Sequence, residues 1–157
     1  MGTMHRVSSR VARLETTRQD RIDAEALAGL RLCWNAENRL TIAERCAHGE
    51  GDETRLTELY EEVGAVARQR ALEARYGRRA VHEACERITA RMLADVSRKT
   101  DTGEALTDDE QLFMGEEGAY ARFLRSCTVE EFEHIFAVKD AERIALVRTI
   151  ATLKGVL

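Results

Sequence analysis

The sequence predicts an all-α protein, and three observations support this fold class. The chain of 157 residues contains no proline, whereas average usage of about 5% would give roughly eight, and proline often interrupts helices. Apolar residues recur mostly at steps of three and four, the period of an amphipathic helix. No segment alternates between apolar and polar residues as a strand does. We therefore expect a helical bundle without a β-sheet.

The first predicted helix runs from near Ser9 to about Ala47. A globular helix of nearly 40 residues is long, so we expect an interruption near residues 16–17 or at Gly29. The stretch of residues 48–52 ends this helix, because its two glycines adopt backbone conformations that other residues rarely take.

Two further long helices are predicted after this stretch. The first is capped by Asp52 or Thr54 and continues to Tyr76, where Gly77 offers a C-terminal stop. The second has a broad apolar face over residues 80–96. The sequence leaves open whether Gly77 breaks the rod; an unbroken rod of roughly 45 residues would be about 65 Å long.

Shorter helices are predicted after a polar loop at residues 100–105. Thr107 with Glu110, and Thr128 with Glu131, have the Thr-x-x-Glu spacing of a capping box, in which the two side chains satisfy amides of the first turn. The expected helices cover residues 107–126, with a break at Gly115 or Gly118, residues 129–138 and residues 140–154.

The aromatic residues indicate where the core is densest. Five of the eight lie in the C-terminal third: Phe113, Tyr120, Phe123, Phe132 and Phe136. Because aromatic side chains bury large areas, the compact part of the core is expected there. We expect a single domain over residues 1–157, with a long-helix part (1–104) and a subdomain of short helices (105–157).

Composition also indicates the cellular compartment in which the protein is located. No apolar run approaches the roughly 20 residues that span a bilayer, and no apolar signal-peptide core follows the first residues. We therefore expect a soluble, cytoplasmic protein without membrane contact. The four cysteines are far apart and form no C-x-x-C pair, so we expect buried, reduced thiols.

Charge is unevenly distributed along the chain. The net charge is −4, but residues 66–99 carry +5 and residues 100–142 carry −9. Alternating signs suit neighbouring antiparallel helices whose solvated edges meet opposite charge. A second interpretation is that the arginine-rich stretch binds an anionic partner. The candidate residues are Arg68, Arg75, Arg78 and Arg79.

Histidine and cysteine spacing raises the question of a metal. His82 and Cys85 lie one helical turn apart, and Glu131 and His134 have the spacing found in carboxylate-bridged di-iron bundles. A di-iron site needs that motif twice, and no second copy occurs. We therefore expect no metal and no cofactor, with these four residues as the remaining candidates.

Trp34, the only tryptophan, is expected to pack in the core. The alternative is that it forms the wall of a ligand pocket or an anchor that faces a partner.

The function predicted from these features is non-enzymatic. No Ser-His-Asp or Cys-His arrangement and no phosphate-binding glycine loop can be assembled from the spacing. Long helices with small apolar stripes often complete their cores against a second copy. We expect a homo-oligomeric interaction, assembly or regulatory protein, with a protein partner. Two alternatives remain: a helical enzyme or ligand-binding or metal-binding bundle with an inter-helix pocket, and a nucleic-acid-binding regulator that uses the basic residues 1–21.

Overall fold

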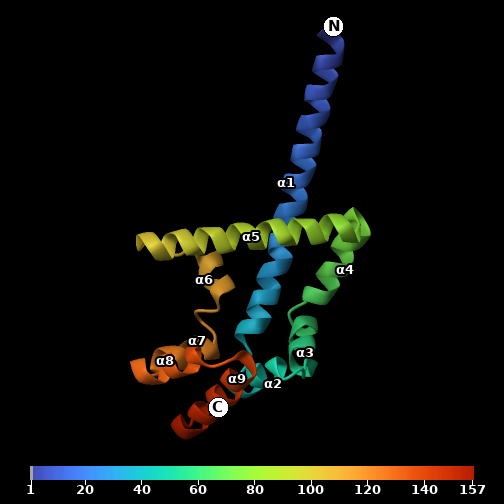
Figure 1. Ribbon diagram of the computed structural model, residues 1–157. Helices are drawn as coiled ribbons and strands as arrows, with labels where there is room; N and C mark the ends of the chain where they lie inside the picture. Colours follow the sequence, from blue (N-terminus) through green and yellow to red (C-terminus); the bar gives the residue numbers. More distant parts are fainter. Residues whose placement is uncertain (1) are drawn as a thin grey trace. The chain divides into compact units, whose positions relative to one another are not determined.

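A computed structural model describes residues 2–157, with side chains for Met4 and for Arg6 onward. Within this range the fold is all helical, which confirms the predicted class (Figure 1). No helix in the described range is both long enough and apolar enough to cross a membrane. The helices are α1 (Gly2–Asn38), α2 (Ile42–Gly49), α3 (Thr54–Glu62), α4 (Ala65–Tyr76), α5 (Arg78–Thr102), α6 (Asp108–Met114), α7 (Ala119–Ser126), α8 (Val129–Ala137) and α9 (Asp140–Lys154).

The helices group into two compact units. The first unit combines the chain up to Leu30 with Val66–Glu104, and the second combines Arg31–Ala65 with Ala105–Leu157. Helix α1 therefore contributes its first part to one unit and its last part to the other. By contact, residues 31–65 group with the short helices that follow residue 104. The expectation of a single domain stays a prediction.

The first unit is built where α5 crosses α1 (Figure 1). Its buried side chains are small or β-branched for the most part, which suits a close crossing of helices. These residues are Ile22, Ala26, Leu72, Val81, Ala84, Ile88 and Val96. Polar contacts join both α5 and α4 to α1: Arg87 Nη2 of α5 donates to Asp23 Oδ1 at 2.7 Å, and the Tyr76 hydroxyl of α4 donates to Glu25 Oε1 at 2.9 Å.

The first predicted helix is wrong in its extent. In the structure, α1 begins at Gly2, continues without interruption past residues 16–17 and Gly29, and ends at Asn38. The next helix, α2, starts after Thr41, whose hydroxyl accepts a hydrogen bond from the Glu44 N–H at 3.1 Å. Thr41 and Glu44 have the same Thr-x-x-Glu spacing as the two predicted capping boxes. The signal for this second helix start was therefore present in the sequence.

Glycines divide the next two predicted helices. The predicted helix to Tyr76 is split at Gly64, which has φ +79°, and Gly77, with φ +89°, ends α4 and breaks the rod. Both angles lie in the left-handed region that side chains other than glycine rarely adopt. At the start of α3, Asp52 Oδ1 accepts a hydrogen bond from the Thr54 N–H at 3.1 Å.

The second unit has a core in which α2 packs against α3, α7 and α9. The buried cluster joins four helices: Ile42 and Cys46 of α2, Phe123 of α7, Ile135 of α8, and Val147 and Ala151 of α9. A second cluster joins the end of α1 to α3 through Ala36, Leu40, Leu56 and Leu59. Both predicted capping boxes are present, and the chain breaks between α6 and α7 around Gly115 and Gly118, as expected.

The aromatic residues only partly follow the expectation. Phe123 is 2% exposed, but Phe132 and Phe136 of α8 are 44% and 45% exposed. The two exposed rings contact each other with centroids 4.7 Å apart, and the Arg143 guanidinium lies 5.2 Å from the Phe136 ring centre. Helical period alone does not show which of two neighbouring faces another helix covers.

Candidate interaction surface

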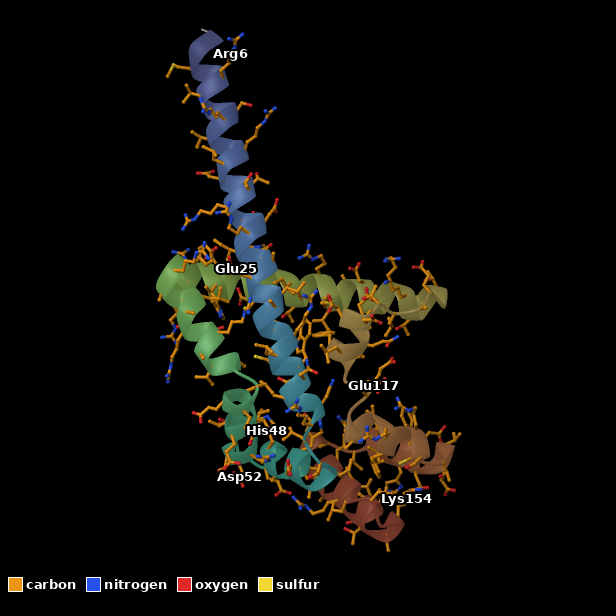
Figure 2. All side chains as sticks on the ribbon, turned by 180° about the vertical axis from the view of Figure 1, so that it is seen from behind. Arg6, Glu25, His48, Asp52, Glu117 and Lys154 are labelled. Atoms are coloured by element: carbon orange, nitrogen blue, oxygen red, sulfur yellow. The ribbon has the colours of Figure 1, made fainter. Side chains whose placement is uncertain are left out.

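The N-terminal part of α1 extends away from the other helices of the first unit (Figure 1). We call residues 4–21 the arm. Every arm side chain that the structure describes is exposed, and burial starts at Ile22. Figure 2 shows Arg6 near the free end and Glu25 close to the crossing with α5. Among the residues that the structure describes, no part of the first unit covers the arm side chains, so they are accessible to a partner.

An apolar stripe runs along the arm. Met4 is 85% exposed, Val7 62%, Val11 48% and Leu14 64%, all well above the exposure of core residues. Their separations of three, four and three residues place all four on one face of the helix. The same separations define positions a and d of a heptad repeat, with Met4 and Val11 at a and Val7 and Leu14 at d.

The charges beside the stripe fit a second copy of the arm in parallel orientation. Arg10 occupies position g and Glu15 the following position e. In a parallel, in-register pair, Arg10 of one chain faces Glu15 of the other, and the pair occurs twice. An antiparallel pair with overlapping stripes brings the two Arg10 side chains together instead. Arg18 and Arg21 occupy the next a and d positions, so the apolar seam ends after Leu14.

A second exposed apolar stripe lies on α8. Val129 is 75% exposed and is followed, three and seven residues later, by the half-exposed Phe132 and Phe136. Glu130 and Glu133 lie beside this stripe. The acidic residues beside this stripe are complementary to a basic helix. The α8 stripe is therefore a second candidate interaction surface, an alternative to the arm.

The predicted anion-binding arginines differ in their surroundings. Arg75 Nη1 lies 3.3 Å from Glu25 Oε1, and Arg79 Nε lies 2.8 Å from Glu83 Oε1. Arg68 and Arg78 are exposed and have no acidic partner in the described part of the chain. The consecutive residues Arg78 and Arg79 line a surface hollow between α4 and α5 together with Glu73, and anion binding there stays a prediction.

The four metal candidates lie in different units. In the first, His82 Nε2 lies 3.3 Å from Glu86 Oε1, and burial raises the pKa of the Cys85 thiol. In the second, Glu131 lies 3.1 Å from Lys154 Nζ, and His134 is exposed. Among the described residues, no group of three or more His, Cys, Asp or Glu side chains is arranged to hold a metal ion.

Trp34 lies in the second unit with the surroundings of a core residue. It is 6% exposed, and its ring meets Phe113 edge to face with centroids 5.3 Å apart. This arrangement is among the geometries that aromatic pairs prefer.

Sequence reasoning missed the exposed stripe because it treated residues 7–14 as part of an inward-facing amphipathic helix. The signal that distinguishes the arm is the change at Arg18 and Arg21, where arginine replaces the apolar residues of the repeat. No match to this chain is found among protein-family models, curated proteins or solved structures. Its function is therefore inferred from its own residues.

Proposed function

We propose that this protein is a non-enzymatic helical assembly protein that forms a homodimer through its arm. The two arms pair as a short, parallel coiled coil over residues 4–15. The observation that carries the proposal is the exposed stripe of Met4, Val7, Val11 and Leu14 in heptad spacing. Val11 at position a and Leu14 at position d form the combination that favours two-stranded, parallel coiled coils, and Met4 at a and Val7 at d extend the apolar stripe by one heptad.

Pairing of two arms accounts for both the exposed apolar stripe and the charged residues beside it. It removes four large apolar side chains per chain from water, and burial of such side chains is the main driving force for helix association. It also pairs Arg10 with the partner's Glu15. A nucleic acid would neutralise the arginines but leave the stripe exposed, so the observations favour a second copy. With only four apolar residues per chain, we expect a dimer that dissociates on dilution.

Sedimentation velocity of the full chain over a concentration series tests the proposal. We expect the sedimentation coefficient to rise with concentration towards that of a dimer. Changing Val7→Glu and Val11→Glu together should keep the protein monomeric, because both substitutions place charge in the seam. The matched control is Ser9→Glu with Thr16→Glu, which adds the same charge on the opposite face of the arm and should leave the dimer intact. Circular dichroism verifies that all variants keep their helix content.

Three results would overturn the proposal. The first is a protein that stays monomeric at every concentration, while the arm carries it onto vesicles containing phosphatidylserine; the stripe would then be a membrane-binding face. The second is dissociation by Phe132→Glu with Phe136→Glu, which would place the interface on α8. The third is an equal weakening of the dimer by the Val7→Glu, Val11→Glu variant and by its control, Ser9→Glu with Thr16→Glu.

A further inference from the structure

Arg45, in α2 of the second unit, differs in its surroundings from the other arginines of the protein. It lines three adjoining hollows with volumes of about 400, 250 and 240 Å³. Among the arginines that have no acidic partner in the described residues, Arg45 is half-buried and the others lie exposed. Its guanidinium lies 5.2 Å from the centre of the Tyr120 ring. A half-buried cation without a counter-ion loses hydration that an anion would compensate.

The 250 Å³ hollow, which we call the Arg45 hollow, lies between α2, α7 and α9. Its lining includes three basic side chains, Arg45, His48 and Arg143, and no carboxylate. By contrast, the 400 Å³ hollow, which Arg45 and His48 also line, includes Glu37 and Glu53, which repel an anion. The charge of Arg45, which no carboxylate of this lining balances, therefore favours an anionic group in the Arg45 hollow.

Two polar groups of this hollow lack partners. His48, labelled on α2 in Figure 2, has a buried Nδ1 atom that forms no hydrogen bond with any residue the structure describes. The Tyr120 hydroxyl also makes no hydrogen bond to a described residue, and burial raises its pKa, so it keeps its proton at neutral pH. Buried polar groups normally have a hydrogen-bond partner in folded proteins. Arg45 and the Tyr120 hydroxyl therefore have donors available to a ligand, and His48 Nδ1 is available as a donor or an acceptor.

The remaining walls are apolar or already occupied. Ile144 and Val147 of α9 and Cys46 of α2 supply apolar surface. Arg143 is paired with Asp140, 3.1 Å away, and donates to the Ile135 carbonyl at 3.2 Å, so its charge is already balanced by a carboxylate. A ligand that suits this lining has one anionic end and a short apolar body.

We propose that the Arg45 hollow binds a small organic carboxylate. The Arg45 guanidinium and the Tyr120 hydroxyl donate hydrogen bonds to the carboxylate, and the apolar body of the ligand contacts Ile144 and Val147. A bare inorganic anion would leave the apolar wall without a partner. This site lies in the second unit and does not depend on dimerisation through the arm.

A ¹H–¹⁵N NMR titration of the full chain with three probes tests the proposal. Benzoate has the proposed chemistry, benzamide has nearly the same shape without the charge, and inorganic phosphate has charge without an apolar body. We expect saturable shifts at amides of α2 and α9 with benzoate. Benzamide should bind at least about tenfold more weakly, which is the effect of one lost charge-assisted hydrogen bond. Phosphate should also bind about tenfold or more weakly, because it keeps the charge but buries no apolar surface against Ile144 and Val147.

Three variants separate specific binding from general electrostatics. Arg45→Gln should weaken benzoate binding by about tenfold or more, and Tyr120→Phe, which keeps the ring, by roughly two- to fivefold. The matched control is Arg39→Gln, which removes an exposed arginine of the same unit that also lacks an acidic partner, and should leave the affinity unchanged. Amide spectra with native dispersion verify that each variant is folded.

The proposal is overturned if benzoate gives no saturable shifts, or if benzamide binds as tightly as benzoate. Phosphate binding equal to that of benzoate would show a site for bare anions. Equal losses in Arg45→Gln and Arg39→Gln would show attraction to the general surface charge instead of a site.

Discussion

Arg31 and Asp109, 78 residues apart in the chain, form a two-point ion pair. Arg31 Nε donates to Asp109 Oδ1 at 2.8 Å, and Nη2 donates to Oδ2 at 2.7 Å. Within the second unit, this pair joins the last part of α1 to the first turn of α6. The carboxylate also lies at the positive end of the α6 dipole. The hydrogen bonds from Arg31 hold the pKa of Asp109 below its ordinary value.

The ion pair predicts a dependence of stability on pH. Because the folded pKa of Asp109 is lowered, its contribution is fully present above the ordinary value of about 3.9 and is lost as the pH falls through the folded pKa. Asp109→Asn should lower the free energy of unfolding at pH 7 by less than about 1 kcal/mol, since both side chains are partly solvated. The difference should shrink towards pH 3. Urea denaturation at both pH values measures it, with Asp108→Asn as the control that keeps the pair.

Two glycines should respond oppositely to alanine. Gly77 has φ +89° and open space around it, so Gly77→Ala introduces backbone strain alone and should destabilise the protein by about 1–2 kcal/mol. Gly29 lies inside α1, and a Cβ there would meet Leu72 Cδ1 at an ordinary 3.8 Å. Gly29→Ala should therefore stabilise the protein by about 0.5–1 kcal/mol. Chemical denaturation of both variants measures the change in the free energy of unfolding. A loss of stability in Gly29→Ala would contradict the expectation.

The close packing of α2 on α9 predicts coupling between two positions. A Cβ at Gly49 would lie 2.7 Å from Ile144 Cδ1 and 3.3 Å from Cγ1, so Gly49→Ala forces this side chain to move. Ile144→Val removes the Cδ1 atom. The double variant should then be more stable than the sum of the two single effects, with a coupling of about 0.5–1 kcal/mol. A double-mutant cycle from urea denaturation measures the coupling, and strict additivity would show that the two residues do not meet.

Cysteine reactivity should differ between the folded and unfolded chain. Burial raises the pKa of the Cys46, Cys85 and Cys127 thiols, and Cys46 is only 5% exposed. The thiolate is the reactive form, so Cys46 should react with iodoacetamide at pH 7.5 about tenfold or more slowly than in urea-unfolded protein. Peptide mass spectrometry over time gives the rate at each cysteine. Equal rates at Cys46 with and without urea would contradict its burial.

The orientation of the proposed dimer predicts a charge-swap result. In a parallel pair, Arg10→Glu places two carboxylates opposite each other, and Glu15→Arg places two arginines opposite each other. Each single change should weaken the dimer, and the double change should restore most of the affinity. Sedimentation velocity measures the dissociation constants. In an antiparallel pair, Arg10→Glu would replace the facing Arg10 side chains with glutamates, and Glu15→Arg would not compensate it.

The sequence by itself determined the helices and most of their ends. The capping boxes at Thr107 and Thr128 and the break at Gly115 follow from hydrogen bonds and backbone angles within a few residues, which local sequence specifies. The sequence left open whether Gly77 breaks the rod, and the structure shows the break there, with φ +89°. The start of α2 at Thr41, which the prediction missed, also depends on a local hydrogen bond within a few residues.

Only the tertiary structure decided which apolar faces are covered. The stripe from Met4 to Leu14 and the buried pair of Ile22 and Ala26 have the same helical spacing, yet the pair is buried and the stripe is exposed. Arg87 of α5 contacts α1 at Asp23, between the two residues of the pair. In the same way, Arg31 pairs with Asp109 while Arg45 remains without a carboxylate. Helical period specifies that a face is apolar, whereas long-range contacts decide whether another helix covers it.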